Sequence, residues 1–226
     1  MKSPFAIAGG LLSLGALALV TTGAAPSAAA NGQNPLFEVT VTNLTRNQPF
    51  SPLLVASHNS DAALYELGQP ASAELALLAE DGDNSALMDA LMLDQNVGNV
   101  ASGLAPVGPG QSDTVLISGS PNARLLSVAS MLVNTNDAFL GLDSIDLPRH
   151  GTRRFFVPAF DAGSEANNEL CAFIPGPACG NPFVRDTAGA EGYVHVHAGI
   201  HGIGDLPPEA YDWRNPSALV TVTRVR

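Results

Sequence analysis

The stretch Asn136-Asp137-Ala138-Phe139-Leu140-Gly141-Leu142-Asp143-Ser144 places an acidic turn directly before an apolar run. Residues 139–145 are expected to form a strand, and a second expected strand, residues 153–158, is followed by Asp161. Carboxylates on adjacent loops of a β-sandwich are a common way to hold a hard cation such as Ca²⁺. The stretch therefore links a strand-rich fold to a candidate calcium site that consists of Asp137 and Asp161.

Other segments of the chain show the same strand patterning. Residues 37–44 alternate apolar and polar side chains and are rich in β-branched residues. Comparable patterns occur in residues 51–57, 112–118, 124–134, 192–199 and 217–226. Strands at short spacing, separated by turn signals, favour an all-β fold with an antiparallel sandwich. Residues 97–110 are rich in Gly and Pro and are predicted to be a loop.

One region departs from the strand pattern. Ser72 can cap a helix that begins at Ala73, and Gly82 is expected to end it. Asn84 or Ser85 then opens a second short helix. The sequence therefore predicts a helical insertion at about residues 72–93, either as a crossover or as a cap at one end of the sandwich.

The first thirty residues have the pattern of a secretory signal peptide. Lys2 gives a positive start, an apolar run covers residues 5–20, and Ala28-Ala29-Ala30 provides an A-x-A cleavage pattern. We expect cleavage after Ala30, a mature domain of residues 31–226, and export to the periplasm or the exterior. A membrane anchor is the alternative, but the run is shorter than the ~20 apolar residues that a span needs. No membrane span is expected after signal removal.

Cleavage would remove Lys2, the only lysine, and leave nine arginines and 21 acidic residues, a formal net charge of −12. Such a surface repels nucleic acid and anionic lipid, and it suits cations or basic partners. The chain has no basic stripe, so nucleic-acid binding is not expected. The lysine-free, alanine-rich mature chain and the simple export signal favour a bacterial origin.

Two cysteines, Cys171 and Cys179, lie eight positions apart. An even cysteine count in an exported chain predicts a disulfide, and residues 174–177, Ile-Pro-Gly-Pro, can reverse the chain direction between them. Closing so small a loop would stabilise the fold by roughly 2–3 kcal/mol. A thiol metal site is the alternative, but the chain has neither a third cysteine nor a CxxC motif.

His195, His197 and His201 form a second candidate site. Residues two apart in a strand point to the same face, and Gly199 and Gly202 leave the backbone around His201 free to fold back. Three imidazoles suit Zn²⁺ or Cu²⁺ better than Ca²⁺, which supports an alternative function as a transition-metal protein or a metal-dependent enzyme. The simpler interpretation is two neighbouring surface histidines with the third in a turn. The chain has no GxSxG or HExxH motif, so an enzyme is not the expected class.

Several motifs, in this order, resemble the spondin amino-terminal domain. They are Phe50-Ser51-Pro52, the Ser-His-Asn-Ser-Asp of residues 57–61, Gly68-Gln69, the helical residues 75–91, Asp137-Ala138-Phe139-Leu140-Gly141-Leu142 and Pro158-Ala159-Phe160-Asp161-Ala162-Gly163-Ser164. The resemblance extends over about residues 37–226.

The resemblance implies a C2-like antiparallel β-sandwich that serves as a secreted, non-enzymatic binding or adhesion module. It also implies Ca²⁺ ligands at Asp137 and Asp161. A further Glu ligand of the family has its nearest position here at residues 118–120, where no acid is present, and a lost charged ligand lowers Ca²⁺ affinity. The expected partner is an extracellular or cell-surface ligand that the sequence does not identify.

Overall fold

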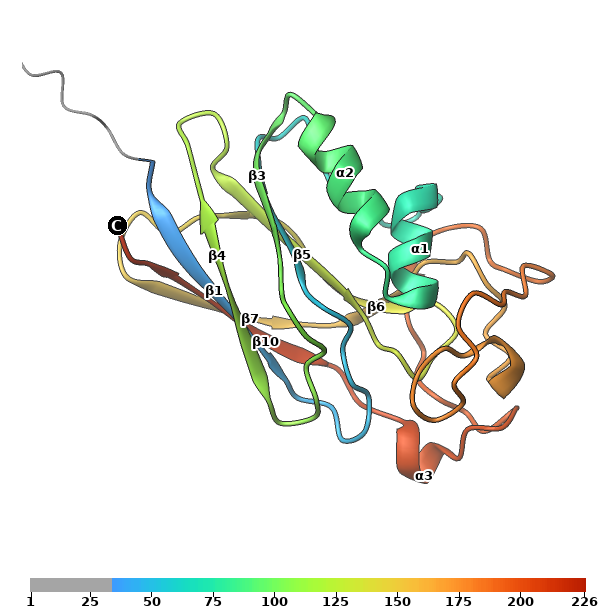
Figure 1. Ribbon diagram of the computed structural model, residues 1–226. Coiled ribbons are helices and arrows are strands. Elements are labelled where there is room, and N and C mark those ends of the chain that lie inside the picture. The colour runs from blue at the N-terminus through green and yellow to red at the C-terminus, as the bar shows by residue number, and fades with distance from the viewer. Residues whose placement is uncertain (1–33) are drawn as a thin grey trace, which may run out of the picture. The chain divides into compact units, whose positions relative to one another are not determined.

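The computed structural model describes residues 34–226, so the predicted signal peptide lies outside the described residues. Within them, two antiparallel sheets pack face to face (Figure 1). The smaller sheet has the order β4 (Ser112–Ser118), β1 (Leu36–Asn43), β10 (Ala218–Arg224), β7 (Thr152–Val157). The larger has the order β3 (Val97–Ser102), β2 (Leu54–His58), β5 (Leu125–Met131), β6 (Ala138–Asp146), β8 (Ala159–Asp161), β9 (His195–Val196). The predicted all-β sandwich is confirmed.

The core between the sheets follows from the alternation of side chains along each strand. In β1, Phe37, Val39 and Val41 point inward and are buried, whereas the residues between them face outward. Val39 lies opposite Val115 of β4 and Val222 of β10, so the inward rows of three strands form one apolar layer. Burial of this layer provides the main stabilisation of the sandwich.

The outer face of the larger sheet is covered by α1 (Ala73–Asp81) and α2 (Ser85–Leu93). The Ser72 hydroxyl accepts the Leu75 N–H at 3.1 Å, and Gly82 ends α1 in the left-handed conformation, as the sequence predicts. Leu75 packs with Phe139 of β6 in a second buried cluster. The insertion is therefore helical as predicted, but it covers a sheet face rather than one end of the sandwich.

Two local predictions were wrong. Residues 97–102, expected to be loop, form β3, because their pairing with β2 outweighs the low strand propensity of glycine. Gly98 is required there, since a Cβ at this position would collide with Ala123. Of the expected strand at residues 192–199, only His195 and Val196 pair, because the neighbouring β8 is three residues long.

Loops between β8 and β10 contain the remaining short elements, η1 (Cys171–Phe173) and α3 (Pro208–Tyr211). Cys171 and Cys179 form the predicted disulfide, with their Cα atoms 4.9 Å apart. In Figure 1 these orange loops gather at the end of the sandwich away from the C-terminus. No helix within residues 34–226 is long and apolar enough to cross a bilayer.

Candidate functional site

Antiparallel register brings the candidate residues to one edge of the larger sheet. Ala138 of β6 lies opposite Asp161 of β8, and Asp161 lies opposite His195 of β9. Asp137 directly precedes β6, in a turn closed by Thr135, whose hydroxyl accepts the Ala138 N–H at 3.1 Å. Pairing of three short strand ends therefore places residues from three distant parts of the sequence side by side.

Asp161 is a buried carboxylate held by local donors. Its Oδ1 accepts the Gly163 N–H at 2.7 Å, and its Oδ2 accepts from the Asn167 amide at 2.6 Å. Burial raises the pKa of Asp161, although both hydrogen bonds and the nearby His195 act in the opposite direction. The carboxylate is therefore oriented by neutral donors, while its negative charge remains poorly compensated.

The hydrogen bond made by His195 fixes which ring nitrogen is free. Its Nδ1 lies 3.1 Å from the Val196 carbonyl, which can only accept, so Nδ1 carries the hydrogen and Nε2 of the neutral ring has a lone pair. Nε2 is buried without a hydrogen-bond partner and lies 3.6 Å from Oδ1 of Asp161. Two acceptors that face each other in this way need a proton or a cation between them.

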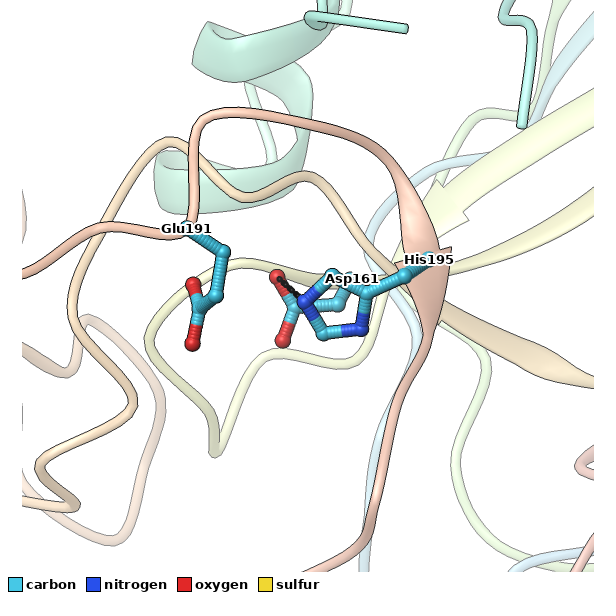
Figure 2. Close-up of side chains that lie close together, drawn as sticks. All are labelled: Asp161, Glu191 and His195. Carbon is cyan, nitrogen blue, oxygen red and sulfur yellow. Dashed lines mark ion pairs between the residues drawn. The ribbon is translucent and has the colours of Figure 1, made fainter. Parts of the chain in front are cut away.

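Glu191 completes the group from the loop that precedes β9. One ligand atom from each of Asp161, Glu191 and His195 lies within 4.8 Å of the others, the one such group of at least three residues in the described chain (Figure 2). The Asn167 amide also donates to Oε1 of Glu191 at 3.1 Å, so one side chain holds both carboxylates. Two carboxylate oxygens and one imidazole nitrogen are a suitable ligand set for a divalent cation.

His197 approaches Asp161 in the other tautomer. Its Nδ1 accepts the Gly199 N–H at 2.9 Å, so the hydrogen of the neutral ring is on Nε2, 3.8 Å from Oδ2 of Asp161. Burial, followed by the charges of His195 and His201, lowers the pKa of His197 to about 4. With its lone pair already engaged by a main-chain amide, His197 supports the site as a neighbour rather than as a ligand.

His201 lies in a loop that the Glu169 carboxylate organises. Glu169 is buried and accepts the N–H groups of His201, Gly202 and Ile203, the last two at 2.7 and 2.9 Å. Its own backbone is left-handed, with φ 56°, and Asn136 accepts its N–H at 3.1 Å. The His201 ring is outside the three-residue group, although all three histidines line the same cavity of about 150 Å³.

Asp137 is fully buried next to this cavity but does not line it. Its Oδ2 accepts the N–H groups of Ser164 and Glu165 at 2.8 and 3.0 Å, whereas its Oδ1 has no partner. Burial, followed by the charge of Asp161, raises the pKa of Asp137 to about 7. Asp137 and Asp161 are therefore electrostatically linked, as neighbours at one edge of the sheet.

The structure joins the two sites that the sequence predicted separately. Asp161, expected to bind calcium, lies with His195, expected to bind a transition metal. Sequence reasoning missed Glu191 and Asn167, which lie in loops without periodic patterning; the only signal was an acid between Gly189 and Gly192. Residues 118–120, where the Glu of the family was sought, lie instead at the opposite end of the sandwich, beside Asp146 and Leu147.

The chain matches the Spondin_N family model over residues 41–166. No curated protein matches the chain. The matched residues include Asp137 and Asp161 but stop before Glu191 and His195, so the resemblance is supported over a shorter range than residues 37–226. Domains of this family are typically extracellular binding modules and are generally not catalytic. Since the match covers more than half of the chain, the protein belongs to the Spondin_N family.

Proposed function

We propose that the protein is an exported, non-enzymatic binding or adhesion module whose loops at one end are ordered by a divalent cation. Asp161, Glu191 and His195 would hold the ion. The observation that carries this proposal is the lone pair of His195 Nε2, buried without a partner, 3.6 Å from a carboxylate oxygen. Two atoms at that separation can both lie about 2.0–2.2 Å from one ion.

The ligand set favours Zn²⁺ over the Ca²⁺ expected from the sequence. Ca²⁺ takes six to eight oxygen ligands, whereas an imidazole nitrogen suits zinc. The Nδ1–H of His195 points to a main-chain carbonyl, the orientation that metal-bound histidines usually have. Ca²⁺ is the second candidate, and the specific observation in its favour is Oδ1 of Asp137, a buried carboxylate oxygen without a partner.

The size of the cavity favours a binding module over the alternative, a metal-dependent enzyme. Its volume of about 150 Å³ is below the ~300–1,000 Å³ typical of small-molecule sites. Ser127 offers no accessible nucleophile either: its hydroxyl lies 2.7 Å from His58 Nε2 and 2.9 Å from Asp143 Oδ1, but it is fully buried and does not line this cavity. The cation then orders loops that present a surface to an extracellular or cell-surface ligand.

Thermal unfolding of the metal-stripped protein tests this proposal. A cation that binds only the folded state stabilises it by about 2.7 kcal/mol at a hundredfold excess over Kd, so Zn²⁺ is expected to raise the unfolding temperature. His195→Ala should abolish this rise. His150→Ala is the matched control, because His150 is an exposed histidine beyond the other end of β6.

Calcium gives the discriminating result. If Ca²⁺ alone stabilises the protein, and Asp137→Asn removes the effect while His195→Ala does not, the oxygen site is the correct one. If neither ion raises the unfolding temperature, or if the His195 and His150 variants lose the effect equally, the proposed cation site is wrong.

A further inference from the structure

The far end of β6 gathers positive charge in an otherwise acidic protein. Four of the nine arginines line one cavity, namely Arg124, Arg149, Arg153 and Arg224. They come from separate parts of the sequence, and strand pairing brings them together. Arg124 precedes Leu125, which lies opposite Asp146, three residues before Arg149. Arg153 lies opposite Val222, two residues before Arg224. The cavity has a volume of about 460 Å³, within the range of ~300–1,000 Å³ for small-molecule sites.

Among residues 34–226, no Asp or Glu side chain forms an ion pair with these four guanidinium groups. Asp146 lines the same cavity, yet its carboxylate forms no ion pair within 4 Å. Arg153 instead donates to the Asp146 carbonyl at 2.9 Å. Arg224 donates to the Arg149 carbonyl at 2.7 Å and, through Nε, to the main-chain oxygen of Arg226 at 3.0 Å. Main-chain oxygens therefore orient two of the cations, and no acidic side chain neutralises them.

Positive charges held close together raise the free energy of the folded state unless an anion compensates them. The chain has 21 acidic residues, yet none of their side chains forms an ion pair with these arginines in the described chain. Most of the N–H donors in the four side chains remain free, because each guanidinium carries five. The arrangement is suited to bidentate contacts with a carboxylate, sulfonate or phosphate group.

The cavity also has an apolar wall. Phe37, Ala123 and Pro148, all buried, line it, and Leu147 and Pro121 add further apolar surface. We propose that this cavity binds a small organic anion in which an acidic group is joined to an apolar body, with the arginines holding the first and the apolar wall the second. The site shares no residue with the cation site, so either proposal can fail without the other.

Calorimetric titration with three probes tests the proposal on the folded protein. Naphthalenesulfonate carries both features, naphthol lacks the charge, and inorganic sulfate lacks the apolar body. We expect one naphthalenesulfonate per chain, bound at least about tenfold more tightly than either of the other two, because each lacks one set of contacts.

Arg124→Glu and Arg149→Glu locate the binding. Neither side chain makes a hydrogen bond or ion pair in the described chain, so both variants should fold, and each should weaken naphthalenesulfonate binding about tenfold or more. Arg154→Glu is the matched control: Arg153 and Phe155 face inward along β7, whereas Arg154 lies on the outer face. Equal weakening in all three variants, equal binding of naphthol, or no binding at millimolar concentration would overturn the proposal.

Discussion

The two ends of β6 carry candidate sites of opposite charge. At the Ala138 end, Asp161 and Glu191 converge with His195, whereas at the Asp146 end four arginines line an open cavity. The nine residues of β6 separate the two sites by roughly 26 Å, at about 3.3 Å per residue. The two sites share the strands that lie between them as an apolar scaffold. The loops at each end therefore determine which ligand chemistry the protein offers.

The two ends also use the main chain in opposite ways. At the Ala138 end, carboxylates accept backbone N–H groups, as Asp161 does from Gly163. At the Asp146 end, guanidinium groups donate to backbone carbonyls, as Arg153 does to Asp146. Each end thereby orients charges of one sign without pairing them with the other sign. If this is correct, perturbing one end should leave ligand binding at the other end intact.

Glu169→Gln should give the largest loss of stability, and its effect on ligand binding should be confined to the Ala138 end. The carboxylate accepts three main-chain N–H groups, and an amide would turn a donor toward at least one of them, which costs about 3 kcal/mol. Urea denaturation measures the loss, with exposed Glu209→Gln as the control. Zinc binding should weaken while naphthalenesulfonate affinity stays within about twofold; a parallel fall in both affinities would contradict the independence of the two ends.

Removal of the disulfide should have a somewhat smaller effect. Replacing Cys171 and Cys179 by serine opens a loop of eight residues, and the expected cost is about 2–3 kcal/mol because the unfolded chain gains freedom. Chemical denaturation of the oxidised protein and the double variant measures this difference. An unchanged free energy of unfolding would show that other contacts, such as the Cys171 N–H to Asp205, suffice to hold the loop.

Glu165 should give an effect that depends on pH. Its side chain is buried, and burial is the largest cause that raises its pKa from 4.5 to about 8. The folded protein therefore retains a proton that the unfolded chain has released, so this residue lowers stability progressively as pH rises from 4.5 to 8. Glu165→Gln should remove that decline.

Denaturation of the metal-stripped protein at several pH values across this window measures the effect. Naphthalenesulfonate affinity should not change over the same range, because arginine stays charged. A pH profile that is identical in the wild-type protein and the Glu165→Gln variant would show that Glu165 ionises as freely in the folded state as in the unfolded chain.

Sequence patterning was sufficient for the parts of the fold that depend on local periodicity. Alternation predicted β1, and the Ser72 and Gly82 signals located α1, because capping and strand propensity act within a few residues. It failed at β3, where the pairing of Val97–Ser102 with β2 is a tertiary effect that overrides a glycine. The local sequence pattern could not show that residues 97–102 would lie beside β2 and pair with it.

The candidate sites were predictable only in part, for the same reason. Asp137 and Asp161 stand beside apolar strands, so their turns could be located from sequence. Glu191 reaches the site through a loop whose path depends on Asn167 and on the β8–β9 pairing. The arginine cavity left no stripe in the sequence, because its members are spread between Arg124 and Arg224 and meet only through antiparallel register.

Anomalous diffraction from crystals of the mature protein grown with Zn²⁺ tests the central claim most directly. The account predicts one strong peak about 2.0–2.2 Å from Nε2 of His195 and from carboxylate oxygens of Asp161 and Glu191. The same peak should be absent in His195→Ala crystals and present in Arg153→Gln crystals. No peak at this position, or a peak bound by His197 and His201 without His195, would contradict it.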